Sequence, residues 1–222
     1  MISVDHLTKE FRMGTEVVRA LDSVSFQAGK GDFVTVAGPS GSGKSTLLMT
    51  LGGLIHPTQG NVLIGNVDIY SQSADTIAEF RRRTIGFVFQ QFHLVPYLTA
   101  WENVALPLML NGYQAGQHKK KAIEILGRFE LGKRADHKPS QLSVGQQQRV
   151  AMARTLVNDP DILLADEPTA SLDPALSRNL IDTLAELNRD GKTVVLVTHS
   201  PELAAVGTNR LALRDGRLAP AT

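Results

Sequence analysis

One segment constrains the fold of this 222-residue chain more than any other. Residues 38–46 read G-P-S-G-S-G-K-S-T, which fits the pattern G-x-x-x-x-G-K-[ST]. The apolar run Phe33–Ala37 precedes this segment, and the helical pattern Leu47–Leu54 follows it. A strand, a glycine-rich turn and a helix in this order surround a phosphate group with backbone N–H groups and a helix N-terminus. The sequence therefore predicts an α/β protein that binds a phosphate-bearing ligand here.

The residues of this segment are expected to share the binding of a triphosphate. Glycine permits a close backbone approach to phosphate oxygens. Lys44 is expected to hold the β- and γ-phosphates, and Ser45 to bind Mg²⁺, which prefers oxygen ligands. A glycine turn without a ligand is the alternative, which the agreement of spacing, strand and helix disfavours. The expected nucleotide-binding residues are Gly38, Pro39, Ser40, Gly41, Ser42, Gly43, Lys44, Ser45 and Thr46.

Two adjacent carboxylates follow another apolar run, at Asp166-Glu167. Ligands of open α/β sheets collect at the carboxyl ends of the strands. Asp166 is therefore expected in the Mg²⁺ shell, and Glu167 is expected to polarise an attacking water as general base. An acidic pair in a solvated loop is the alternative, which the phosphate loop upstream disfavours.

The remaining patterns predict a sheet with helices between its strands. Strands are expected at Ile85–Phe89, Ile162–Ala165 and Val194–Val197, and helices at Lys119–Phe129, Arg149–Val157 and Leu176–Arg189. Shorter alternating runs over residues 1–33 and 60–69 indicate an antiparallel layer. Strand signals vanish from residue 98 to about 157, where a helical insert is expected. Asp215-Gly216 supplies the positive φ of a tight turn and predicts a hairpin over Leu211–Leu218.

Composition excludes several classes of protein. The absence of Cys excludes disulfides, thiolate metal sites and Cys nucleophiles. The net charge of +1 gives no field typical of a nucleic-acid-binding protein, so no nucleic-acid partner is expected. The best candidate for a membrane span, Leu94–Leu110, is interrupted by prolines and by Glu102 and Asn103, so none is expected. No secretory signal is expected at the N-terminus.

Taken together, these motifs resemble the ABC ATPase family. Residues 142–149, L-S-V-G-Q-Q-Q-R, resemble its signature sequence, and Gln90 at the end of an apolar run resembles its Q-loop glutamine. Ser171–Asp173 resembles the D-loop, and Thr198-His199 resembles the switch histidine. The order of the motifs agrees with the family, and the resemblance covers essentially the whole chain.

The resemblance implies an ABC-type P-loop NTPase fold over residues 1–222, with a mixed sheet core, an N-terminal antiparallel β layer and a helical subdomain at about residues 91–158. It implies ATP and Mg²⁺ as ligands and ATP hydrolysis as the reaction. Gln90 would serve Mg²⁺ and catalysis, and His199 would contact the γ-phosphate and the attacking water. A second copy, arranged head to tail, would complete the site with Ser143, Gly145 and Gln146.

Two further positions, Phe11 and Val144, are compared with the family one by one. Phe11 resembles the aromatic residue that stacks on adenine, and its alternative is a core residue. Either Val18 or Ala20 would flank the base, and the sequence does not choose between them. Val144 stands where the commonest signature has Gly; a positive φ is costly for a β-branched residue, so we expect an ordinary φ and retained activity.

Within the family, residues 90–94 and 98–104 resemble the group of lipoprotein-releasing, macrolide-exporter and cell-division ATPases. The group implies a peripheral subunit at the cytoplasmic face of the inner membrane that drives a membrane permease for export or mechanotransmission. Contact with the permease is expected through Gln90–Val104, and packing inside the helical insert is the alternative for each residue there.

Two other functions remain as alternatives. The first is a regulatory ATPase without transport, such as a cell-division signal transmitter. The second is an ABC ATPase acting on DNA or ribosomes, which the lack of a coiled-coil insert, zinc motif or second cassette disfavours. The basic run His118–Lys121 is expected to be a solvated helix start rather than a nucleic-acid site.

Overall fold

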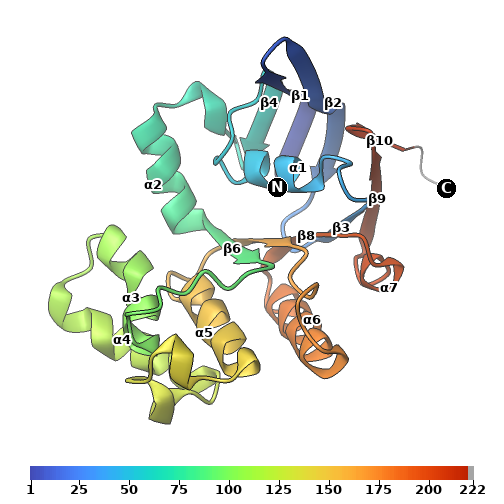
Figure 1. The fold of residues 1–222 in the computed structure, drawn as a ribbon. Helices are drawn as coiled ribbons and strands as arrows, with labels where there is room; N and C mark the ends of the chain where they lie inside the picture. The colour runs from blue at the N-terminus through green and yellow to red at the C-terminus, as the bar shows by residue number, and fades with distance from the viewer. Residues whose placement is uncertain (220–222) are drawn as a thin grey trace.

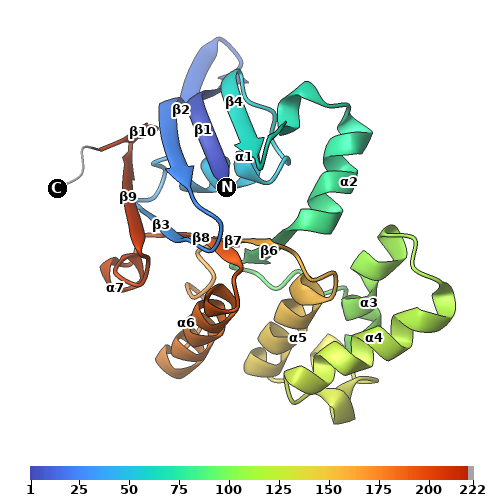
Figure 2. The same cartoon turned by 180° about the vertical axis from the view of Figure 1, so that it is seen from behind.

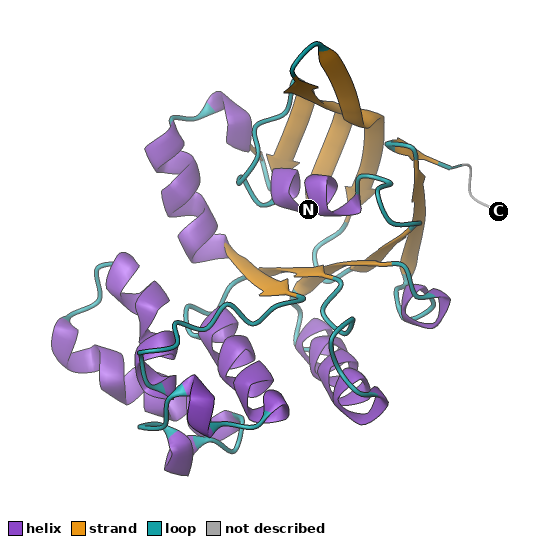
Figure 3. Ribbon diagram, in the orientation of Figure 1, coloured by secondary structure: helices purple, strands orange, loops and turns teal. Residues whose placement is uncertain are grey.

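The computed structural model describes residues 1–219, which form both strands and helices (Figures 1 and 3). The strands are β1 (Ile2–Met13), β2 (Glu16–Ala28), β3 (Phe33–Ala37), β4 (Gln59–Ile64), β5 (Val67–Asp68), β6 (Ile85–Phe89), β7 (Ile162–Asp166), β8 (Thr193–Thr198), β9 (Asn209–Arg214) and β10 (Arg217–Leu218). The α-helices are α1 (Lys44–Leu51), α2 (Ala74–Thr84), α3 (Ala100–Leu110), α4 (Ala115–Arg128), α5 (Val144–Leu156), α6 (Pro174–Arg189) and α7 (Pro201–Ala204). Short 3₁₀ turns are η1 (Ile69–Ser71), η2 (Gly132–Arg134) and η3 (Pro139–Gln141).

A six-stranded mixed sheet forms the centre of the fold, in the order β10-β9-β3-β8-β7-β6. Its strands are parallel except for β10, which pairs with β9 in antiparallel fashion. Successive residues of a strand point to opposite faces, and here both faces are covered: Leu163 and Val194 pack on one side, Leu164 and Val195 on the other. Burial on both faces explains why these strands are continuous apolar runs in the sequence.

A second sheet, antiparallel and four-stranded, has the order β2-β1-β4-β5. Helix α1 lies between the two sheets (Figures 1 and 2). Its Leu47, Leu48 and Leu51 are buried in the core that the sheets share. The predicted fold class, with a mixed sheet and an N-terminal antiparallel layer, is therefore confirmed.

Helices α5 and α6 cover the opposite side of the mixed sheet, and α3 and α4 pack on α5 (Figure 2). The N-termini of α3 and α5 both carry capping boxes, in which a hydroxyl and a side-chain oxygen three residues later each accept a backbone N–H. Thr99 and Glu102 cap α3, and Ser143 and Gln146 cap α5. Helix α5 thus begins at Val144, five residues before the predicted start.

Two local predictions need correction, and one helix was missed. Helix α1 ends at Leu51 rather than Leu54, because Gly52 and Gly53 follow and Gly53 has a φ of 66°. Helix α2 was not predicted. His118 is not a solvated helix start: it lies inside α4, is buried, and its Nε2 is 2.7 Å from the carbonyl oxygen of Tyr113. Within residues 1–219, no helix is both long and apolar enough to span a bilayer.

Candidate functional site

The predicted site residues of the mixed sheet meet at one edge because their strands are parallel and in register. Ala37 at the end of β3 pairs with Thr198, and Asp166 at the end of β7 pairs with Val197. Phe89 at the end of β6 pairs with Asp166. The segments that follow these strand ends therefore emerge side by side: residues 38–43, His199, Glu167 and Gln90.

The loop 38–43 has little room for side chains at its two ends. Gly43, the N-cap of α1, has a φ of 100°, and a Cβ on it would overlap the carbonyl oxygen of Ala20. A Cβ on Gly38 would overlap the carbonyl oxygen of Leu213. The loop is thus pressed between β2 and β9, while its other side faces the edge of the sheet.

Lys44 is buried at the first position of α1, and its ammonium group is directed back into the loop. Its Nζ donates to the carbonyl oxygens of Gly38 at 2.8 Å and Pro39 at 2.9 Å. The same nitrogen lies 3.7 Å from Glu167 Oε1. A cation at the start of a helix and beside a glycine-rich loop is well placed to bind phosphate.

Ser45 and Asp166 bring two oxygen donors together beside the loop. Ser45 Oγ donates to Asp166 Oδ1 at 3.0 Å. Burial raises the pKa of Asp166, and the hydrogen bond from Ser45 partly opposes this rise. A desolvated carboxylate next to a hydroxyl fits a small divalent cation that binds oxygen and shares its shell with phosphates. The donor set thus fits Mg²⁺.

Glu167 and His199 form the second polar pair of the site. Glu167 Oε2 lies 2.8 Å from His199 Nδ1 and accepts the backbone N–H of His199 at 3.3 Å. The backbone N–H of Glu167 donates to the carbonyl oxygen of Val197 at 3.1 Å. Glu167 has a φ of 43°, in the left-handed region that a glutamate rarely adopts. Such strain is typical of functional positions, and here it directs the carboxylate toward Lys44 and His199.

Gln90 is exposed at the end of β6. Its Nε2 donates to Ser171 Oγ at 3.5 Å, in the segment that resembles the D-loop. Asp173 in the same segment caps α6, since its Oδ1 accepts the N–H groups of Ala175 and Leu176 at 2.9 Å. Within residues 1–219, no hydrogen bond joins Gln90 to Ser45 or Asp166.

The signature segment and Phe11 lie on other elements. Ser143, Gly145 and Gln146 are at the N-terminus of α5, and no described hydrogen bond joins them to residues 38–46. Val144 has no positive φ, as predicted, and its side chain is exposed.

Phe11 is exposed on β1 opposite Val18, with Lys9 Nζ 5.1 Å from its ring centroid. Val18 and Ala20 are two residues apart on β2 and so share the face of Phe11.

Two residues to which the sequence analysis gave no such role hold the loop after Gln90. Arg154 of α5 donates to the carbonyl oxygens of Phe92 and His93, both at 2.6 Å. Asn103 of α3 is fully buried, and its amide binds the backbone of residues 95–99. Only burial could have indicated them, and a single sequence does not display burial at isolated polar positions.

Three features at one edge of the sheet define a P-loop nucleoside triphosphatase. They are a phosphate loop with its lysine at the start of a helix, a hydroxyl–carboxylate pair and a Glu–His pair. Residues 21–170 match the ABC transporter family. MJ0796 of Methanocaldococcus jannaschii, an uncharacterized ABC transporter ATP-binding protein, is 48% identical over 98% of this chain and 95% of its own length. MacB of Hyphomonas neptunium, a macrolide export ATP-binding/permease protein, is 43% identical over 98% of this chain, which spans 34% of MacB.

The solved structures agree with these relatives. A dimeric structure of a post-hydrolysis state of the ATP-binding cassette MJ0796, bound to ADP and Pi, matches 98% of this chain and 96% of its own. The TM-score is 0.89 and the sequence identity 46%. The present chain therefore belongs to the ABC transporter family. The predictions of an ATP-binding cassette and of an ATP-hydrolysing transporter subunit are confirmed.

Proposed function

We propose that the chain binds MgATP at residues 38–46 and hydrolyses it in a head-to-tail dimer with a second copy. The observation that carries the proposal is the cluster at one sheet edge of Lys44, the Ser45–Asp166 pair and the Glu167–His199 pair. Lys44 would hold the β- and γ-phosphates once phosphate oxygens replace the carbonyl groups that it now contacts. Ser45, Asp166 and Gln90 would hold Mg²⁺, which neutralises phosphate charge when bound.

Glu167 is the proposed general base. Its carboxylate lies between a cation, Lys44, and the imidazole of His199, so a water next to the γ-phosphate would face Glu167 Oε1 or Oε2. His199 would hold that water and contact the γ-phosphate. Phe11 would stack on the adenine ring from the edge of the antiparallel sheet.

The proposed dimer gives the signature segment a task. Ser143, Gly145 and Gln146 lie at the N-terminus of α5, where hydroxyl, N–H groups and helix dipole favour an anion. In a head-to-tail dimer these groups of one copy would meet the γ-phosphate held by the other. Hydrolysis removes that shared group, and the closed dimer loses the ligand that favoured it. The dimeric MJ0796 cassette supports this arrangement by similarity.

The proposed output is the movement of a membrane permease. MacB is an ATP-binding/permease protein, and its similarity to the present chain supports a peripheral place at the cytoplasmic face of the inner membrane. Contact would involve Gln90–Val104. Tyr97 is its most exposed aromatic side chain, with 72% of its surface accessible, while Trp101 is partly buried beneath Lys119.

Glu167→Gln tests the proposal because it removes the basic carboxylate and keeps the size of the side chain. Turnover is expected to fall about 10²- to 10⁴-fold, while ATP binding and an ATP-dependent dimer persist. Size exclusion with light scattering measures the dimer, and phosphate release measures turnover. Adding Ser143→Ala should remove the dimer and leave ATP binding in the monomer. Wild-type turnover by Glu167→Gln would overturn the assignment of the base.

A further inference from the structure

The phosphate loop is held from behind by the turn between β9 and β10. The backbone N–H of Gly216 in this turn donates to the carbonyl oxygen of Ser42 at 3.1 Å. The carbonyl oxygen of Gly216 accepts the N–H of Asp22 at 2.8 Å. The turn, the loop and β2 are therefore in continuous backbone contact.

Strand pairing alone fixes this turn weakly. Strand β10 comprises only Arg217 and Leu218, which pair with Arg214 and Leu213 of β9. A two-residue ladder leaves the position of Gly216 to other contacts. The two backbone hydrogen bonds of Gly216 supply part of these contacts, and side chains add to them.

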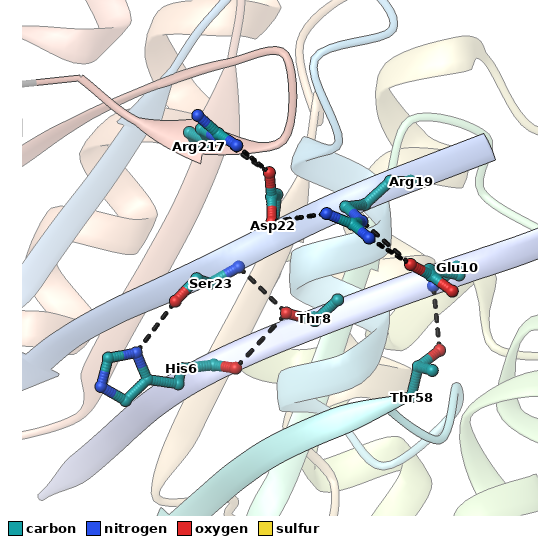
Figure 4. A network of polar contacts seen from close by, with 8 residues as sticks. All are labelled: His6, Thr8, Glu10, Arg19, Asp22, Ser23, Thr58 and Arg217. Atoms are coloured by element: carbon teal, nitrogen blue, oxygen red, sulfur yellow. Dashed lines mark hydrogen bonds and ion pairs between the residues drawn. The ribbon is translucent and has the colours of Figure 1, made fainter. Parts of the chain in front are cut away.

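Asp22 connects the turn to the antiparallel sheet through a chain of ion pairs (Figure 4). Its Oδ2 accepts Arg217 Nε at 2.6 Å, and its Oδ1 accepts Arg19 Nη1 at 3.3 Å. Arg19 Nε in turn donates to Glu10 Oε1 at 2.9 Å, and the N–H of Glu10 donates to Thr58 Oγ1. The hydrogen bond from Arg217 lowers the pKa of Asp22, which shows that the folded structure stabilises the charged carboxylate.

Asp22, which lies on the β1–β2 hairpin together with Arg19 and Glu10, thus connects two parts of the site through Arg217. One part is the phosphate loop, through Gly216 and Ser42. The other is the β1–β2 hairpin that carries Phe11, the residue next to Glu10. Fixing one relative to the other fixes the span between the phosphate and base ends of a nucleotide.

We infer that Asp22 is a positioning residue, which through Arg217 and Arg19 holds the phosphate loop and the β1–β2 hairpin in the geometry that binds ATP. The inference rests on the proposed nucleotide site and deepens it. Neither Asp22 nor Arg217 contacts Glu167 or His199 among the described residues. Their loss is therefore expected to change affinity and to leave chemistry unchanged.

Charge exchange between positions 22 and 217 tests the inference. Asp22→Asn and Arg217→Gln are each expected to raise the Kd for MgATP about two- to fivefold, the range typical of an exposed ion pair, with kcat within about twofold. Asp22→Lys should raise Kd further, because the new positive charge would be repelled by Arg217 and Arg19. Adding Arg217→Glu to Asp22→Lys should recover part of the lost affinity, because it restores one ion pair while the repulsion from Arg19 remains. Titration with a fluorescent ATP analogue gives Kd, and phosphate release at saturating ATP gives kcat.

A matched control separates positioning from general stability. Glu79→Gln breaks another exposed ion pair, to Arg83 on α2 at 2.7 Å, and should leave Kd unchanged. A lower melting temperature in Asp22→Asn and Arg217→Gln without a change in Kd would overturn the inference, as would a double variant no better than Asp22→Lys. If wild type itself failed to bind ATP, the proposed nucleotide site would be wrong instead.

Discussion

Asn103 offers the sharpest test of how the loop after Gln90 is held. Its side chain is fully buried in α3, where Oδ1 accepts the N–H of Val95 at 2.7 Å. Its Nδ2 donates to the carbonyl oxygens of Val95 at 3.1 Å, Leu98 at 3.2 Å and Thr99 at 3.0 Å. One amide therefore fixes the backbone over residues 95–99, inside the segment proposed to contact the permease.

The expected cost of Asn103→Ala follows from these contacts. One acceptor and two N–H donors supply the equivalent of three hydrogen bonds, each worth about 0.5–1.5 kcal/mol net. Backbone groups left without partners add to the loss, and water reaching the partly buried Val95 reduces it. We expect the free energy of unfolding to fall by about 2–4 kcal/mol.

Asn103→Asp distinguishes this network from simple packing, because it preserves shape and the acceptor for Val95. At pH 7 a carboxylate would face three carbonyl oxygens that now receive N–H donors, so the loss should at least equal that of Asn103→Ala. Below the pKa of the new acid, the protonated side chain donates again and part of the stability should return.

Urea unfolding at several pH values measures these differences, with m-values checking that the unfolded states match. Asn111→Ala is the matched control, because Asn111 also lies at α3 but its side chain makes a single bond, to the carbonyl oxygen of Arg82 at 3.3 Å. Its expected cost is about 1 kcal/mol. The reasoning is refuted if Asn103→Ala costs no more than Asn111→Ala, or if Asn103→Asp is the more stable variant at pH 7.

Two further predictions concern the phosphate site. Gly43→Ala should lower the free energy of unfolding by more than about 2 kcal/mol and abolish ATP binding in calorimetry, because the φ of Gly43 is 100° and a Cβ would overlap the backbone of Ala20. The control is Gly127→Ala, which has open space around it in α4 and should instead raise the free energy of unfolding by up to about 1 kcal/mol. Burial raises the folded-state pKa of Asp166, so the contribution of this side chain to the free energy of unfolding falls as pH rises. The fall begins near the pKa of an unfolded-state aspartate, about 4, and continues through the raised folded-state pKa. Asp166→Asn should remove this slope and make the nucleotide-free protein more stable at pH 7 in urea unfolding, while weakening Mg²⁺-dependent ATP binding; unchanged stability and affinity would contradict both statements.

The central strands were predictable because their burial on both faces leaves continuous apolar runs. Strands at Phe33–Ala37 and Ile85–Phe89 appear in the structure with the predicted bounds. Helix α2 was missed because its eleven residues include five charged ones and a single buried side chain, Ile77. The start of α5 could have been predicted from the sequence, since Ser143 and Gln146 form an S-x-x-Q capping box.

The residues of the candidate site likewise divide into those that the sequence predicts and those that it does not. Lys44 and Asp166 were predictable because each follows a local pattern of a strand and a turn, and parallel strands bring such ends together. His199 was expected only from the resemblance to the ABC ATPase family. The contacts of Asn103 and Arg154 with the loop after Gln90 were not, because each is one polar residue whose partner depends on packing. Asp22 and Arg217 are 195 positions apart in the sequence, so no local pattern predicts their contact.

Ser143 shows how one group can serve both the fold and the proposed dimer. Its Oγ accepts the N–H of Gln146 at 3.3 Å and thereby caps α5 in the single chain. A hydroxyl that accepts a hydrogen bond still carries one proton to donate. The cap fixes the oxygen at the helix N-terminus, and the proton can turn toward a γ-phosphate presented by a second copy. Because the cap already orders this side chain, closing the dimer needs little further ordering of Ser143. The same reasoning leads us to expect that Val144 is tolerated: capping and donation use Ser143 and the N–H groups of the first turn, and the exposed side chain of Val144 takes part in neither.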